Sequence, residues 1–179
     1  MPLDVIAERA GVGAGTVHRH FPTKEALVAA VVTDRLAGLA ARARALADAV
    51  DATRSDNLAG SRGDSPGAAD AIPTSDAAAA FTAFLTELTA EASHNVTLTG
   101  ALGGAGIGAD GAAAAAALAE SLGRLLEYAQ LDGGVRADLT VPDLHAILSG
   151  VITMERGLSA EHRGIGLAIV IDGLTARRG

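Results

Sequence analysis

The sequence lacks cysteine and tryptophan, and its 179 residues include one tyrosine, three phenylalanines and a single lysine. Without cysteine, neither a disulfide framework nor a thiolate metal site can form. The longest apolar run, 165–171, is far shorter than the roughly 20 residues that span a bilayer. The N-terminus has no basic stretch followed by an apolar segment, which a secretory signal needs. These absences predict a cytoplasmic chain that does not interact with membranes.

Acidic residues outnumber basic residues by 21 to 14, and the excess is unevenly distributed. Residues 1–25 carry equal numbers of each, so the rest of the chain accounts for the whole net charge of −7. An acidic body does not attract nucleic acid through its overall field. Any contact with DNA is therefore expected from the short N-terminal segment.

Two short helices joined by a glycine-containing turn are predicted at the N-terminus. The first has an apolar face at helical spacing, formed by Leu3, Ile6, Ala7 and Ala10. Gly11 ends this helix as a residue that adopts positive φ. A second helix follows three residues later, with Val17 and Phe21 facing inward, and Pro22 ends it. We expect the core of this unit to contain Ile6, Val17, Phe21 and Leu27.

The remaining pattern predicts an all-α fold, in which a helical bundle follows the N-terminal unit. Thr23 caps a third helix that reaches about Ala49, with inward positions Leu27, Val31, Leu36 and Leu39. Residues 51–76 are rich in Asp, Ser, Gly and Pro and predict a long mobile loop. Residues 77–92 form an amphipathic helix whose apolar side is Phe81, Phe84, Leu85 and Leu88.

Three further helices are expected after a glycine-rich, irregular segment at 100–111. Asp110 is predicted to cap an alanine-rich helix that reaches about Gln130. Thr140 and Asp143 form a capping box that opens a helix to about Met154. Residues 161–174 are apolar nearly all round, and without a partner strand they favour a helix.

The glycines at positions 11, 13 and 15 have two possible explanations. A dinucleotide-binding loop needs a preceding strand within a parallel sheet, whereas a helix precedes these glycines. A helix, a tight turn and a short second helix instead form a helix-turn-helix, whose second helix enters the major groove of DNA. The glycines are therefore interpreted as turn residues, and Gly15 also allows a close approach to DNA.

The segment LDVIAERAGVGAGTVHRHFPTKEALVAAVV, residues 3–32, resembles the DNA-binding signature of the TetR family of bacterial regulators. The FTAFLTELTAEASHN and GGVRADLTVPDL stretches are similar to one effector-domain subgroup of that family. The resemblance implies a homodimeric transcription factor, usually a repressor, that leaves its operator when a small molecule binds. It also implies a DNA-binding domain at 1–45 and an effector-binding and dimerisation domain at 46–179.

Carried onto this sequence, the family's DNA-binding positions are Ala14, Gly15, Thr16, His18, Arg19, His20 and Lys24. The resemblance places Thr16 and His18, which stands where tyrosine is more usual, at phosphates and base edges. Lys24 would meet a phosphate, and Arg19 is the strongest candidate for reading guanine. As alternatives, His18 or His20 could pack against a neighbouring helix, and Lys24 could be an ordinary solvated residue.

The sequence departs from the family in one respect, because a further helix normally precedes the helix-turn-helix. Here Met1 and Pro2 lead directly into the family's second helix. The expectation we favour is that the true start lies upstream. The alternative is a ligand-binding helical dimer that no longer binds DNA productively because of N-terminal truncation.

The larger domain is expected to hold a small-molecule cavity between its helices. The candidate liners are Phe84, His94, Leu98, Tyr128, His145 and Met154, each of which also suits a plain core position. An aromatic content of 2% argues against a cage for a cationic or flat ligand. The last two helices, 143–157 and 161–174, are expected to pack with a second copy as a four-helix dimer interface.

Catalysis is the competing function. Acid-base groups occur at His94, His145 and His162, together with Asp143 and Glu161. They have no metal-ligand spacing, and no nucleophile has a base beside it in a recognisable motif. The sequence therefore predicts no catalytic residue, no metal site and no cofactor.

Overall fold

The computed structural model describes residues 1–60, 76–94 and 107–175, and helices account for most of these residues. The helices are α1 (Leu3–Arg9), α2 (Ala14–His20), α3 (Lys24–Gly60), α4 (Asp76–His94), α6 (Gly108–Leu131), α7 (Val141–Gly157) and α8 (Ile165–Leu174), with a 3-10 turn at Ala160–His162. Strand-like pairing in the described ranges is limited to an isolated bridge between Val135 and Thr175. The predicted all-α fold is confirmed.

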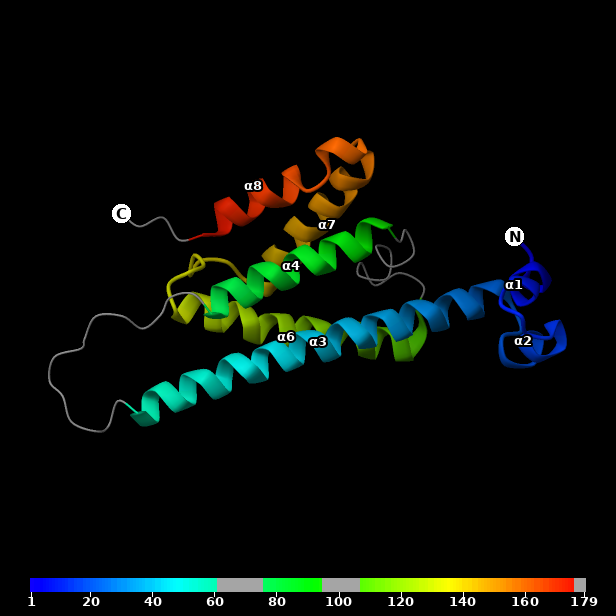
Figure 1. Ribbon diagram of the computed structural model, residues 1–179, viewed down its shortest axis with the longest axis horizontal. Helices are drawn as coiled ribbons and strands as arrows, with labels where there is room; N and C mark the ends of the chain where they lie inside the picture. Colours follow the sequence, from blue (N-terminus) through cyan, green and yellow to red (C-terminus); the bar gives the residue numbers. More distant parts are fainter. Residues whose placement is uncertain (61–75, 95–106, 176–179) are drawn as a thin grey trace, which may run out of the picture.

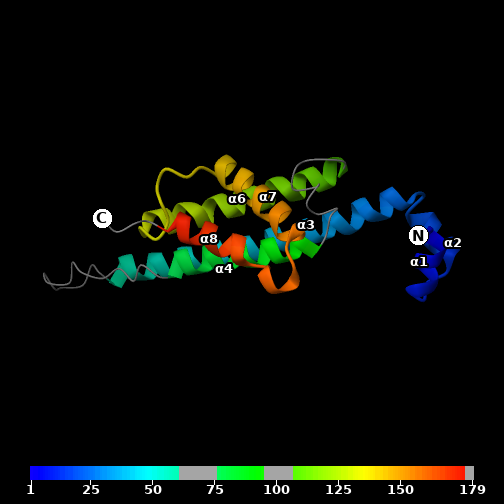
Figure 2. The ribbon, with the colours of Figure 1, turned by 90° about the horizontal axis from the view of Figure 1, so that it is seen from above.

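The long helix α3 connects the two ends of the molecule (Figure 1). The α1 and α2 pair sits at its N-terminal end, beyond the bundle that α4, α6, α7 and α8 build along the rest of α3. Seen from above, α1 and α2 again lie beyond one end of the bundle (Figure 2). The boundary expected at residues 45 and 46 therefore falls inside one continuous helix, and the division into two domains stays a prediction.

Helix α3 is longer than predicted, since residues 51–60 are helical rather than part of a loop. Val50 is buried, and the Arg54 guanidinium pairs with Asp132 and lies 5.6 Å from the ring centroid of Tyr128. These contacts with α6 stabilise a polar sequence as helix, because tertiary packing outweighs weak local preference. The rest of the predicted loop, residues 61–75, lies outside the described residues.

The core lies between α3, α4, α6 and α7. The predicted apolar face of α4 is confirmed, because Phe81, Phe84, Leu85 and Leu88 are all buried. On α3, Leu36 and Leu39 are buried as predicted, but Val31 is wrong: it is 49% exposed, and Val32 takes the inward position. Val32 and Leu36 are four residues apart and therefore share one face of α3, and this is the face that is buried in the bundle.

Two of the predicted helix starts are confirmed and one is wrong. Thr23 accepts from the backbone N–H of Ala26 at 3.1 Å, as an N-cap of α3 does. Thr140 and Asp143 form the predicted capping box, and the Thr140 hydroxyl, followed by its backbone N–H, lowers the pKa of Asp143. Asp110 caps nothing, because α6 already begins at Gly108 and places Asp110 inside its first turn.

A buried carboxylate joins the last two helices. Glu155, near the end of α7, is only 4% exposed. Its oxygens accept from the backbone N–H groups of Gly164, Gly166 and Leu167 at 2.5, 3.0 and 3.3 Å. This places a negative charge at the N-terminus of α8, where the helix dipole favours it. Helix α8 therefore begins at residue 165 rather than 161.

Helices α7 and α8 approach each other closely at Gly166. A Cβ atom at this position would overlap the Cε atom of Met154 and lie 3.0 Å from Oε1 of Glu155. Gly164, with a φ of 90°, makes the turn that precedes α8. The two glycines thus allow the Glu155 carboxylate to reach the backbone of α8.

Candidate functional site

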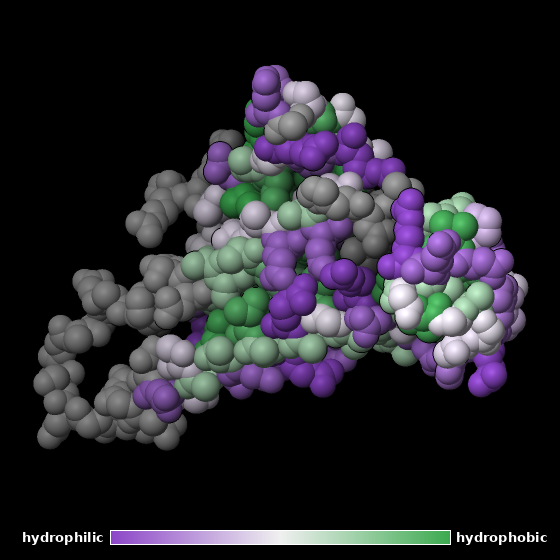
Figure 3. Space-filling view, turned by 45° about the vertical axis from the view of Figure 1, so that its right-hand side comes forward, coloured by the Kyte–Doolittle hydropathy of each residue, from purple (hydrophilic) through white to green (hydrophobic). Residues whose placement is uncertain are grey.

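Helices α1 and α2 form a tight helix-turn-helix unit. Gly11 has a φ of 67°, which glycine adopts without steric cost, and it ends α1 as predicted. The backbone N–H of Thr16 donates to the carbonyl of Gly13 at 2.9 Å, so α2 begins directly after the turn. In Figure 3 this unit stands out at one end of the molecule, with hydrophilic side chains around a smaller hydrophobic patch.

The unit has less interior than the sequence predicts. Leu3 and Ala7 of α1 are buried, but the expected core residues Ile6, Val17, Phe21 and Leu27 are only half-buried. These four side chains face inward but are only partly covered, because two seven-residue helices and one end of α3 enclose little volume.

All the predicted DNA-binding residues are exposed, namely Ala14, Gly15, Thr16, His18, Arg19, His20 and Lys24. They occupy α2 and the first residue of α3. Within α2 only Val17 is partly covered, so almost the whole helix faces outward. A Cβ atom at Gly15 would meet nothing within 4 Å, and the protein's own packing therefore does not require glycine there.

His18 contacts α1. Its Nε2 atom lies 2.9 Å from Oδ1 of Asp4, and both side chains are largely exposed. A carboxylate can only accept, so Nε2 carries the hydrogen and Nδ1 remains available. Sequence reasoning missed Asp4, although it named His18. An acidic residue on α1 and a basic residue on α2 could have suggested the contact, but only the geometry of the turn shows that the two side chains meet.

The other cations of the unit are free of acidic partners among the described residues. No described carboxylate lies within 4 Å of Arg9, Arg19 or Lys24, whereas Arg35 and Arg42 on the outer part of α3 pair with carboxylates of α4. An unpaired guanidinium or ammonium group keeps its full capacity to bind phosphate or base edges. Arg9, Arg19 and Lys24 therefore leave three unpaired cations on the helix-turn-helix unit.

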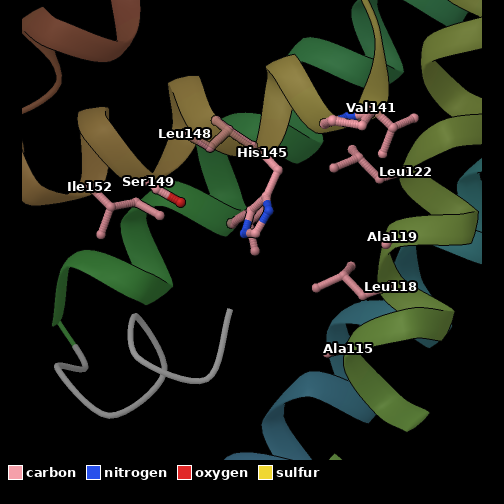
Figure 4. A pocket seen from close by; sticks show the side chains of 11 residues that line it. Ala115, Leu118, Ala119, Leu122, Val141, His145, Leu148, Ser149 and Ile152 are labelled. Carbon is pink, nitrogen blue, oxygen red and sulfur yellow. The ribbon is translucent and has the colours of Figure 1, made fainter. Parts of the chain in front are cut away.

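A second candidate site is a cavity of about 290 Å³ between α4, α6 and α7 (Figure 4). Its lining residues are Leu88, Ala115, Leu118, Ala119, Leu122, Val141, Pro142, His145, Leu148, Ser149 and Ile152. In the close-up, the imidazole of His145 points from α7 into the space before Leu118 and Ala119 of α6. The walls are therefore almost wholly aliphatic, with two polar side chains on one helix.

Of the six ligand-binding residues expected from the sequence, His145 lines this cavity. Phe84 is a buried core residue, Tyr128 lies under Arg54, and Met154 packs near Gly166. Leu98 and the side chain of His94 lie outside the described residues. Ser149 was missed, although it stands one helical turn after His145 and shares its face of α7.

Within the described ranges, no group of three or more His, Asp or Glu residues is placed to hold a metal ion. The helices described there include none that is both long and apolar enough to cross a membrane.

An exposed helix-turn-helix unit, joined by one long helix to a bundle with an apolar cavity, defines the class of helix-turn-helix transcription regulators. Residues 2–31 match the family described as bacterial regulatory proteins, tetR family. Residues 76–176 match the family described as transcriptional regulator SbtR-like, C-terminal domain.

A solved structure supports the same assignment. The chain is similar to a TetR transcription regulatory protein from Mycobacterium vanbaalenii, with 34% identity, a TM-score of 0.58, and coverage of 98% of this chain and 83% of that one. None of the curated proteins matches the chain. The chain belongs to the TetR family of transcriptional regulators, and its family and fold are those of DNA-binding regulators rather than enzymes.

Proposed function

We propose that the chain is a repressor that binds operator DNA as a homodimer through α2 and leaves it when a small molecule occupies the cavity. The observation that carries this proposal is the exposure of every side chain that the family signature assigns to DNA. The family is one of bacterial regulators, whose operators lie on DNA in the cytoplasm, so the chain would act there.

The exposed face of α2 suits a major groove. Thr16 and Arg19 stand one turn apart, and a guanidinium can bind O6 and N7 of guanine together. Ala14 and Gly15 carry no hydrogen-bonding side chain, so they allow α2 to lie close to the bases, and the methyl group of Ala14 can contact thymine. Lys24, at the first turn of α3, is placed for a phosphate beside the groove.

Dimerisation through α7 and α8 is supported by apolar side chains on the outside of the bundle. Met154, Ile165 and Ile169 are 47%, 48% and 66% exposed. Gly150 and Gly157 on α7 leave room for a close approach, since a Cβ atom at either position meets nothing within 4 Å. Two copies related by a twofold axis would bury these residues and form a four-helix interface.

Ligand control follows from the connection between cavity and DNA-binding unit. Helix α6 forms one cavity wall and packs extensively along α3, and α3 carries α1 and α2 at its far end.

We therefore assign DNA binding to residues 1–45 and effector binding and dimerisation to residues 46–179. Half-sites about 34 Å apart require one separation of the recognition helices. A ligand that binds a dimer with a different separation more tightly, by about 5 kcal/mol, would shift most of the protein from the DNA-bound form to the free form.

A gel-shift experiment with DNA flanking the gene tests the proposal. We expect sequence-dependent binding by the purified chain, with an affinity that falls steeply as salt concentration rises. Equal affinity for flanking and scrambled DNA at every salt concentration would contradict it. Such a result would favour a ligand-binding helical dimer that does not engage DNA productively.

A further inference from the structure

Among the described residues that line the cavity between α4, α6 and α7, the polar side chains all lie on α7. His145 and Ser149 are four residues apart on α7, and the facing wall on α6 consists of Ala115, Leu118, Ala119 and Leu122. No described residue hydrogen-bonds the imidazole of His145 or the hydroxyl of Ser149. A ligand in this space would therefore meet polar partners at one point and hydrocarbon elsewhere.

Among the described residues, the lining carries no acidic side chain and no aromatic ring apart from the His145 imidazole. His145 is exposed, so a head group beside it lies near solvent, but a permanently cationic head group would find no carboxylate among the described lining residues to offset the water that it loses. A flat aromatic ligand would find no stacking partner. An oxygen head group can instead bond to the imidazole and the hydroxyl, both of which can donate or accept.

The size of the cavity limits the length of the ligand. An apolar cavity of about 150 Å³ holds benzene, which has six carbon atoms. By the same proportion, 290 Å³ accommodates about twelve non-hydrogen atoms. Ala115 and Ala119 lie one turn apart on α6, and their small side chains leave space for a chain between α6 and α7.

We infer that the cavity binds an aliphatic compound of about eight to ten carbon atoms with a single oxygen head group, held by His145 and Ser149. The inference rests on the proposed function, because it names the effector class for the same cavity. The hydrocarbon part gains free energy by leaving water, and the head group sets its orientation.

Direct binding to the purified full chain tests the ligand class. The probes are 1-octanol and octanoate, with octyltrimethylammonium as a cationic probe of the same chain length, measured by isothermal titration calorimetry. We expect the two oxygen-headed probes to bind at least tenfold more tightly than the ammonium compound. Equal or tighter binding of the ammonium compound, or no binding of either oxygen-headed probe, would overturn the inference.

Two pairs of variants locate the binding site. Ala119→Leu fills the cavity and should weaken octanol binding at least tenfold, whereas Ala116→Leu, exposed on the same helix and outside the lining, should not change it. His145→Leu should weaken octanol binding at least fivefold, and His145→Gln should restore most of that loss. Circular dichroism checks that each variant is folded, with Ala115→Val as a milder substitute for Ala119→Leu. Unchanged binding in a folded filling variant would place the ligand elsewhere and overturn the inference.

The failure of this inference can be separated from failure of the proposed function. Octanol binding that is weakened by Ala119→Leu and His145→Leu, but that does not release DNA in a gel-shift, would support the ligand class and contradict ligand-controlled repression. Specific DNA binding by a chain that binds neither octanol nor octanoate would overturn the ligand class and leave the regulator intact.

Discussion

Nε2 of His18 lies 2.9 Å from Oδ1 of Asp4, so a side chain of helix α1 restrains a side chain of the helix that we propose reads DNA. The contact directs Nδ1 of His18 away from α1. It also sets a carboxylate beside the face that we propose binds DNA, where it would repel phosphate. We therefore propose that Asp4 positions His18, and that removing it changes sequence preference and affinity in different ways.

We expect Asp4→Ala to broaden the sequence preference of DNA binding, because His18 loses its restraint. Asp4→Asn should retain the preference, since the amide oxygen can still accept from Nε2. Glu8→Ala removes one exposed charge from the same helix and serves as the control for charge alone. The measurement is competition between operator and point-substituted operators at fixed salt. If Asp4→Ala and Glu8→Ala behave alike, the contact does not position His18.

Substitution of Lys24 should act on affinity alone. Lys24→Ala is expected to weaken binding to all DNA sequences by a similar factor, because a phosphate contact carries no sequence information. The slope of log affinity against log salt concentration should become shallower by about one unit. Gel-shift titrations at three salt concentrations measure both effects. An unchanged slope would show that Lys24 is an ordinary solvated residue.

Arg19→Ala should relax the preference at particular base pairs. Loss of a bidentate contact to guanine is expected to remove about 1–3 kcal/mol of discrimination at one position of each half-site. A binding series with every base tested at each operator position measures it. Arg9→Ala, which removes an unpaired charge from α1, provides a matched control. A uniform loss across all positions would assign Arg19 to the phosphate backbone instead.

The Glu155 carboxylate should contribute substantially to stability. Glu155→Ala leaves two buried N–H groups of α8 without an acceptor, and we expect the free energy of unfolding to fall by about 2–3 kcal/mol. Glu155→Gln keeps one acceptor oxygen and should lose less. Glu161→Ala, at an exposed position, should stay within about 0.5 kcal/mol. Urea denaturation compares the three variants, and equal losses for Glu155→Ala and Glu161→Ala would refute the assignment.

The proposed dimer interface is open to a matched comparison of two exposed apolar residues. Ile169 on α8 and Leu131 at the end of α6 are 66% and 64% exposed. Ile169→Glu should dissociate the dimer, because it would bury an unpaired charge, whereas Leu131→Glu should not affect it. Analytical ultracentrifugation gives the dissociation constants. Dissociation by Leu131→Glu alone would place the interface at the C-terminal end of α6 instead of on the exposed face of α8.

Prediction from the sequence succeeded where the signal was local. Gly11 and the capping box of Thr140 and Asp143 each involve residues within a few positions, and the apolar face of α4 repeats at helical spacing. It failed at residues 51–60, whose composition favours a loop, because Arg54 stabilises the helix through its contacts with Asp132 and Tyr128. For the candidate sites, His18 and His145 were named, but Asp4 and Ser149, which lie beside them, were not.

The sequence by itself determined the family, the helix-turn-helix and the outward position of the residues that we propose bind DNA, because glycine turns, caps and helical periodicity are properties of adjacent residues. Only the tertiary structure decided which helices enclose the cavity, which carboxylate holds the start of α8 and how far α3 extends. Those features depend on residues such as Asp132, which lies 78 positions from its partner Arg54. No local pattern specifies such pairs, since they meet only after the helices have packed.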